Sequence, residues 1–101
     1  MTIPGRVSIE PRAIRAIVEA TAAETFRTTP KSVRAKVHAA EGRLEVEFAT
    51  PYGGAEPVLS AAAAGREAVS ARSSEISGAR FDRVRVRITG LIEHDDRRRV
   101  E

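Results

Sequence analysis

The stretch that decides the fold is Phe-Asp-Arg-Val-Arg-Val-Arg-Ile-Thr at positions 81–89. Arginine alternates here with valine and isoleucine. Successive side chains of a β-strand point to opposite faces of its sheet, so this alternation predicts a strand with one apolar face and one charged face. The residues expected in the core are Val84, Val86 and Ile88, and those expected in solvent are Arg83, Arg85 and Arg87.

Two further segments, residues 32–40 and 43–50, show the same alternation, and Glu41 and Gly42 separate them. A short turn with glycine between two alternating segments is typical of a β-hairpin, in which Gly42 would supply a positive φ angle. The hairpin residues expected in the core are Val37, Val46 and Phe48, and Lys36 and Glu45 are expected to be exposed or ion-paired.

Helical spacing of apolar residues predicts a first helix over residues 11–27, with proline in its first turn, where proline is tolerated. Thr-Thr-Pro at 28–30 is expected to end it, because proline cannot continue the helical hydrogen bonds. Residues 55–77 predict a second, alanine-rich helix that Gly78 stops in a left-handed conformation. The buried stripe expected on the second helix comprises Val58, Ala62, Gly65, Val69 and Ile76, and its stretch 61–65 is expected to pack on Ala16, Ala20 and Ala23.

With a short first strand at residues 6–9, the element order is β-α-β-β-α-β. This order predicts an α+β fold, with two helices packed on one face of a mostly antiparallel sheet and a charged, open opposite face. The order also suggests a split β-α-β, ferredoxin-like sheet, although the strand order stays open. We expect one domain over residues 5–92 and a polar C-terminal tail over 93–101.

Composition narrows the class of protein. The chain has 101 residues, no cysteine and a formal net charge of +3, with 31% charged residues. The surface is therefore of mixed sign, and disulfides and thiolate metal sites are excluded. The N-terminus shows no apolar segment typical of a signal peptide, and no apolar run approaches a membrane span. We expect a cytoplasmic protein, whose attachment to the inner face of the membrane would need another protein.

Candidate catalytic and metal-binding residues are few. The two histidines, His38 and His94, are expected in solvent, and Asp95 and Asp96 beside His94 read as a charged tail rather than a metal site. Glu45 and Glu47 share one strand face, where ion pairing with neighbouring strands is favoured over acid–base catalysis. The sequence predicts no enzyme, no catalytic residue, no cofactor and no metal.

The ordered combination of segments resembles the alkaline-shock-protein family of bacterial envelope-stress proteins. The resemblance covers residues 5–92 and departs from the family at 26–30, where Phe-Arg-Thr-Thr-Pro stands in place of a frequent Gly-Val pair. The segments that carry it are Gly-Arg-Val-Ser-Ile at 5–9, Ala-Ala-Glu at 22–24, Glu-Gly-Arg-Leu-Glu-Val-Glu-Phe at 41–48, Tyr-Gly at 52–53 and Val-Arg-Val-Arg-Ile-Thr-Gly-Leu at 84–91.

The resemblance implies a non-enzymatic scaffolding protein of the envelope-stress response. Such proteins self-associate and reach the membrane through a separate membrane-anchored partner, without inserting themselves. An RNA-binding module is the alternative, because the same element order occurs in the RNA-recognition fold, although the outward positions hold arginine and glutamate in place of stacking aromatics. The residues predicted to bind a partner are Arg34, Lys36, Arg83, Arg85 and Arg87.

Overall fold

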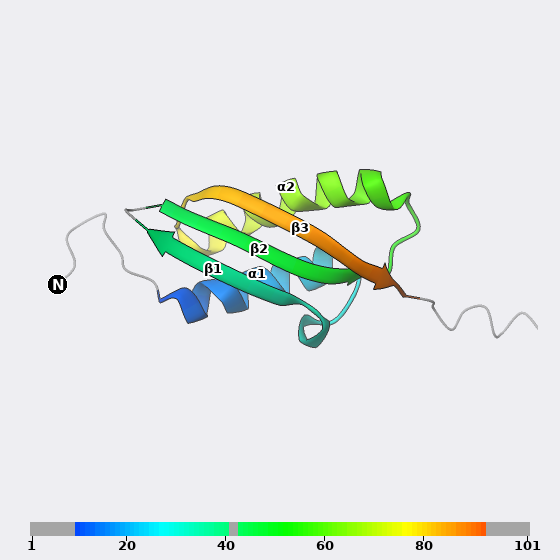
Figure 1. The fold of residues 1–101 in the computed structure, drawn as a ribbon, viewed down its shortest axis with the longest axis horizontal. Coiled ribbons are helices and arrows are strands. Elements are labelled where there is room, and N and C mark those ends of the chain that lie inside the picture. The colour runs from blue at the N-terminus through cyan, green and yellow to red at the C-terminus, as the bar shows by residue number, and fades with distance from the viewer. Residues whose placement is uncertain (1–9, 41–42, 93–101) are drawn as a thin grey trace, which may run out of the picture.

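The computed structural model describes residues 10–40 and 43–92 (Figure 1). These residues form two helices and a three-stranded sheet, which confirms the expected α+β class. The strand predicted at 6–9, the turn at 41–42 and the tail at 93–101 lie outside the described residues. The elements are α1 (Pro11–Thr25), the short 3-10 helix η1 (Pro30–Ser32), β1 (Arg34–Ala40), β2 (Arg43–Tyr52), α2 (Val58–Ser77) and β3 (Phe81–Leu91).

The sheet has the strand order β1-β2-β3, with β2 in the centre. β1 and β2 form the expected antiparallel hairpin, whereas β2 and β3 are parallel. α2 supplies the crossover that a parallel pair requires. β2 pairs with β3 from Leu44 opposite Phe81 to Tyr52 opposite Leu91, so no strand separates them. This direct pairing overturns the suggested ferredoxin-like order, in which another strand lies between these two.

Both helices cover the same face of the sheet, and the opposite face is open (Figure 1). α1 packs against β1 and β2, and α2 packs against β3 and α1. The predicted alternation is confirmed on all three strands, because the apolar side chains face the helices and the charged ones do not. Val46 and Phe48 are buried, Val37, Val84, Val86 and Ile88 are half-buried, Glu45 is half-buried, and Lys36, Arg83, Arg85 and Arg87 are exposed.

Three of the four aromatic side chains meet at the centre of the core. The ring of Phe26 is 1% exposed and contacts Phe48 and Tyr52 edge-on, with ring centroids 5.9 and 6.4 Å away. Edge-to-face packing at such distances adds about 0.5–1.5 kcal/mol per pair beyond the buried area. Phe26 thus joins the end of α1 to the central strand.

Gly65 lets α2 lie directly on this aromatic cluster. A Cβ atom at position 65 would stand within 2.8 Å of Phe26 Cε1 and closer still to Cζ. No real side chain fits there without displacement of the Phe26 ring. The absence of a side chain at Gly65 therefore sets the distance between α2 and the core.

The end of α1 differs from the sequence prediction. The helix stops at Thr25, Phe26 caps it, and Arg27 takes a left-handed φ of 59°. The Phe26 carbonyl then accepts a hydrogen bond from the Gly53 N–H at 2.9 Å. The chain therefore turns at Phe26 and Arg27, where the buried ring is anchored, and not at the Thr-Thr-Pro segment, whose proline opens η1.

β2 extends through Pro51 to Tyr52, beyond the predicted end at Thr50. Proline has no N–H to donate, and so it is tolerated in a strand mainly at an edge or a bulge. Here β1 pairs only as far as Ala49, and the pairing with β3 shifts register between Thr50 and Pro51. The sheet accommodates Pro51 by this irregularity.

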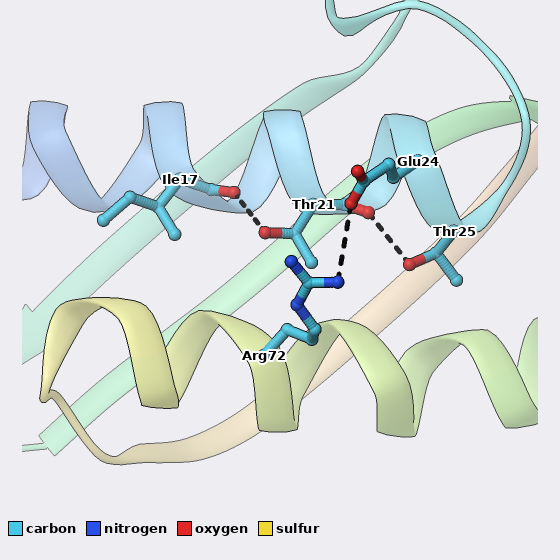
Figure 2. Close-up of polar contacts among 5 residues, drawn as sticks. All are labelled: Ile17, Thr21, Glu24, Thr25 and Arg72. Carbon is cyan, nitrogen blue, oxygen red and sulfur yellow. Dashed lines mark hydrogen bonds and ion pairs between the residues drawn. The ribbon is translucent and has the colours of Figure 1, made fainter.

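α1 and α2 lie against each other, and an ion pair joins them at the periphery (Figure 2). The Thr21 hydroxyl donates to the Ile17 carbonyl at 2.7 Å, and the Thr25 hydroxyl donates to the Thr21 carbonyl at 2.9 Å. These bonds satisfy the hydroxyls inside α1. Glu24 and Arg72 join the two helices at 3.6 Å, but both side chains are more than half exposed, so the pair contributes at most about 1 kcal/mol.

The buried stripe of α2 is narrower than predicted. Val58 and Ala62 are half-buried, and Ile76 is 56% exposed, so its predicted burial is wrong. The alanine contact is also only partly right, because Ala16 and Ala20 are exposed. Serines take the places where apolar residues were expected. The buried residues recur every fourth position, at Gly65, Val69, Ser73 and Ser77.

Replacing Gly65 by alanine should destabilise the protein. The added methyl group would collide with the Phe26 ring, and such overpacking costs about 1–3 kcal/mol, which exceeds the gain of about 1 kcal/mol from removing a helical glycine. Gly90→Ala is the control, since a Cβ there meets nothing within 4 Å. Thermal unfolding should show a lower Tm for Gly65→Ala alone. An unchanged Tm would contradict the contact.

The two buried serines of α2 should respond oppositely to alanine. The Ser73 hydroxyl is buried and has no hydrogen-bond partner among the described residues. Ser77 donates to the Ser73 carbonyl at 2.7 Å and accepts from the Ala79 N–H at 3.0 Å. Urea unfolding should show Ser73→Ala stabilised and Ser77→Ala destabilised, each by about 0.5–1.5 kcal/mol. An equal loss in the free energy of unfolding for both variants would show that the Ser73 hydroxyl has a hydrogen-bond partner.

Candidate functional site

The face of the sheet that the helices leave open brings all five predicted partner-binding residues together. Arg34 and Lys36 come from β1, and the three arginines come from β3, with β2 between them. All five are exposed. Across the sheet the outward side chains form three rows, which are His38–Glu45–Arg83, Lys36–Glu47–Arg85 and Arg34–Ala49–Arg87.

The row at Ala49 differs from the other two because its central residue is a methyl group and not a carboxylate. β1 and β3 lie about 10 Å apart on either side of β2, within reach of two extended arginines. A hollow of about 470 Å³ lies over this part of the face. Its lining comprises Arg34, Lys36, Glu47, Phe48, Ala49, Arg85, Val86 and Arg87.

The cations of this face are not neutralised by close ion pairs. Within residues 10–40 and 43–92, the ion pairs are Arg66 with Glu67 and Arg72 with Glu24, all on the helices. Glu45 and Glu47 lie opposite Arg83 and Arg85 in the register, yet neither makes an ion pair. With Arg43, which shares the outward side of β2 with Glu45 and Glu47, the described face therefore carries six cationic side chains against two carboxylates.

His38 lies at the end of this face nearest the hairpin turn. It is exposed, as predicted, and lines a smaller hollow of about 210 Å³ with Glu45 and Arg83. In the part of the chain that the structure describes, no three His, Asp or Glu side chains gather to hold a metal ion. The residues around His94 lie outside that part.

A second hollow, of about 680 Å³, was not predicted from the sequence. It lies between the end of α1, the loop after β2 and the first half of α2, and small residues such as Ala61, Ala64 and Ala68 form much of its wall. The Tyr52 hydroxyl beside it accepts a hydrogen bond from the Glu56 N–H at 2.9 Å. A side chain at Gly54 would collide with the Tyr52 ring. The glycine therefore shapes this loop, and no local sequence pattern indicated the hollow.

Comparison with known proteins finds no match. No family model, no curated protein and no solved structure is similar to this chain at a significant level. Within residues 10–40 and 43–92, neither helix has the length and apolarity needed to cross a membrane. The charged face of the sheet is therefore the feature of the described residues that bears most directly on function.

Reversing the charge of Arg85 and Arg87 should leave the fold intact. Both side chains are exposed on the open face and make no ion pair, so their replacement by glutamate should change the free energy of unfolding by less than about 1 kcal/mol. Circular dichroism and thermal unfolding measure this. A loss of several kcal/mol would mean that the arginines support the sheet, and the face could not then be tested by this change.

Proposed function

We propose that this protein is a non-enzymatic scaffolding module that binds an acidic segment of a partner protein on the open face of its sheet. One observation carries the proposal. Six cationic side chains share this face and keep their charges free of ion pairs in the described residues. Most of these cations lie on β1 and β3, on either side of β2, so a bound carboxylate is attracted by several of them at once.

The type of cation supports a carboxylate ligand. Five of the six are arginines, whose planar guanidinium group binds carboxylates with two parallel hydrogen bonds. Arg34 and Arg87 flank Ala49, where no protein carboxylate stands between them. Arginine is also enriched at protein interfaces. With no carboxylate beside it on β2, Arg87 is available to a carboxylate of the partner.

The resemblance to the alkaline-shock-protein family gives this proposal its cellular setting. In that setting the partner is a membrane-anchored protein with an acidic segment on the cytoplasmic side, and the complex acts in the envelope-stress response. The module itself stays at the inner face of the membrane through this partner.

The RNA-binding alternative has weaker support. Sequence-tolerant binding of single strands relies on exposed aromatic rings on which bases stack. Here Phe26, Phe48 and Tyr52 are buried, and Phe81 is half-buried against the core. Glu45 and Glu47 would also repel phosphates on the same face. The cations alone would give weak, salt-sensitive binding.

Affinity capture from the native host, with membranes included, tests the proposal. The baits are the wild type, the Arg85→Glu/Arg87→Glu variant and an Arg12→Glu/Arg15→Glu variant, which makes the same charge change on the exposed side of α1. We expect the wild type and the α1 variant to retain one membrane protein with an acidic segment, and the face variant to lose it.

Equal retention by all three baits would contradict the proposal. Recovery of RNA that nuclease removes, together with submicromolar binding of single-stranded RNA at physiological salt, would favour the RNA-binding alternative.

A further inference from the structure

The two edges of the described sheet differ in how they are closed. At the β1 edge, the Glu19 carboxylate on α1 accepts a hydrogen bond from the Ala35 N–H at 3.1 Å. A side chain thus occupies a backbone donor of the shorter edge strand. β3 is the longer edge strand, with 11 residues. No side chain of the described residues bonds to its backbone. The alternate N–H and C=O groups that point away from β2 therefore have no partner among the described residues, and such an edge can pair with another strand.

The inner side of β3 is also incompletely covered. Its apolar residues Val84, Val86 and Ile88 pack against the core but stay half-exposed, whereas Val46 and Phe48 of β2 are buried. An extra strand beside β3 would cover these three side chains with its own inward residues. On the side of β3 away from β2, both its backbone groups and its row of apolar side chains therefore lack a neighbour among the described residues.

Charge disfavours the simplest occupant, a second copy of β3. In an antiparallel pair that continues the sheet with the helices on one side, the outward residues of the two strands lie directly opposite each other. The arginines of one copy would then face those of the other. Like charges in such positions destabilise the pair. A strand with outward carboxylates reverses the sign of this interaction.

We propose that the acidic segment of the partner protein binds as an added strand at the free edge of β3, with acidic outward residues alternating with apolar inward ones. This inference rests on the proposed function and gives it a binding mode. The outward carboxylates lie beside Arg83, Arg85 and Arg87, and main-chain hydrogen bonds supply affinity, as in other cases of strand addition.

The position opposite Arg87 matters most. Arg83 and Arg85 already have Glu45 and Glu47 on the β2 side, whereas Arg87 has Ala49. A carboxylate of the added strand would be the first acidic neighbour of Arg87 within the described sheet. We therefore expect binding to depend most on an acidic residue at the position of the partner strand that lies opposite Arg87.

Peptide binding measured by fluorescence anisotropy at physiological salt tests the binding mode. The probe is a peptide of about nine residues in which valine and glutamate alternate, which is close to the length of β3. The control has the same composition with glutamates and valines in separate blocks. We expect the alternating peptide to bind at least about tenfold more tightly. Equal affinity for both would overturn strand addition.

Backbone methylation gives a sharper test. Only one edge of an added strand bonds to β3, and alternate residues of a strand present their N–H groups to the same edge. Two peptides are compared, one N-methylated at all glutamates and one at all valines. One of the two should lose binding and the other should keep it. A peptide bound only through its charges would respond equally to both series, which would overturn the proposal.

Variants of the protein locate the strand. The Arg85→Glu/Arg87→Glu variant should bind the alternating valine–glutamate peptide at least about tenfold more weakly than the wild type does. It should also gain affinity for an alternating valine–lysine peptide. Arg34→Glu/Lys36→Glu makes the same charge change on β1 and should weaken binding of the valine–glutamate peptide less than about threefold, because the ionic strength screens distant charges. Equal loss in both variants would place the peptide across the face and not at the edge.

These outcomes separate the binding mode from the proposed function. If the block peptide binds as tightly as the alternating one, and its binding depends on the arginines, an acidic partner on the face is supported and strand addition is contradicted. Failure of both acidic peptides to bind would count against the proposed function as well.

Discussion

The packing of Phe26 against the bare backbone of Gly65 is the contact on which the arrangement of the two helices depends. Phe26 follows the last residue of α1 and contacts Phe48 and Tyr52 on the central strand. A side chain at position 65 of α2 would collide with its ring. One ring thus joins both helices to the sheet. In a chain with only four aromatic residues, little else of comparable size is available to fix these elements.

Local patterns were enough to predict most of the elements. The alternation of arginine and valine in β3, the hairpin and the left-handed Gly78 after α2 follow from short-range geometry, and the structure confirms them. The strand order did not follow, because the pairing of β2 with β3 depends on tertiary packing across α2. The buried stripe of α2 was predicted incompletely because it includes Ser73 and Ser77. Burial of a serine depends on the close approach of neighbouring elements and not on its own hydrophobicity, so no local pattern indicates it.

The candidate site was predictable in composition but not in shape. Period-two alternation assigns Arg34, Lys36 and the β3 arginines to one face once the strands are known. The rows across the sheet depend on the register, and so does the gap above Ala49. That register also shows why two glutamates on the central strand do not neutralise the end of the face near Arg87.

The parallel pairing of β2 and β3 has a consequence for how the molecule assembles and opens. The β1–β2 hairpin closes a short loop, whereas β3 can join only after residues 53–80 have been brought round as loop and helix. The entropy lost in closing the longer loop is greater, and such distant pairings form late. β3 is therefore the strand that we expect to join the sheet last. The amide protons of β3 that point away from β2 should exchange with solvent readily, and a segment bound along this edge should slow their exchange.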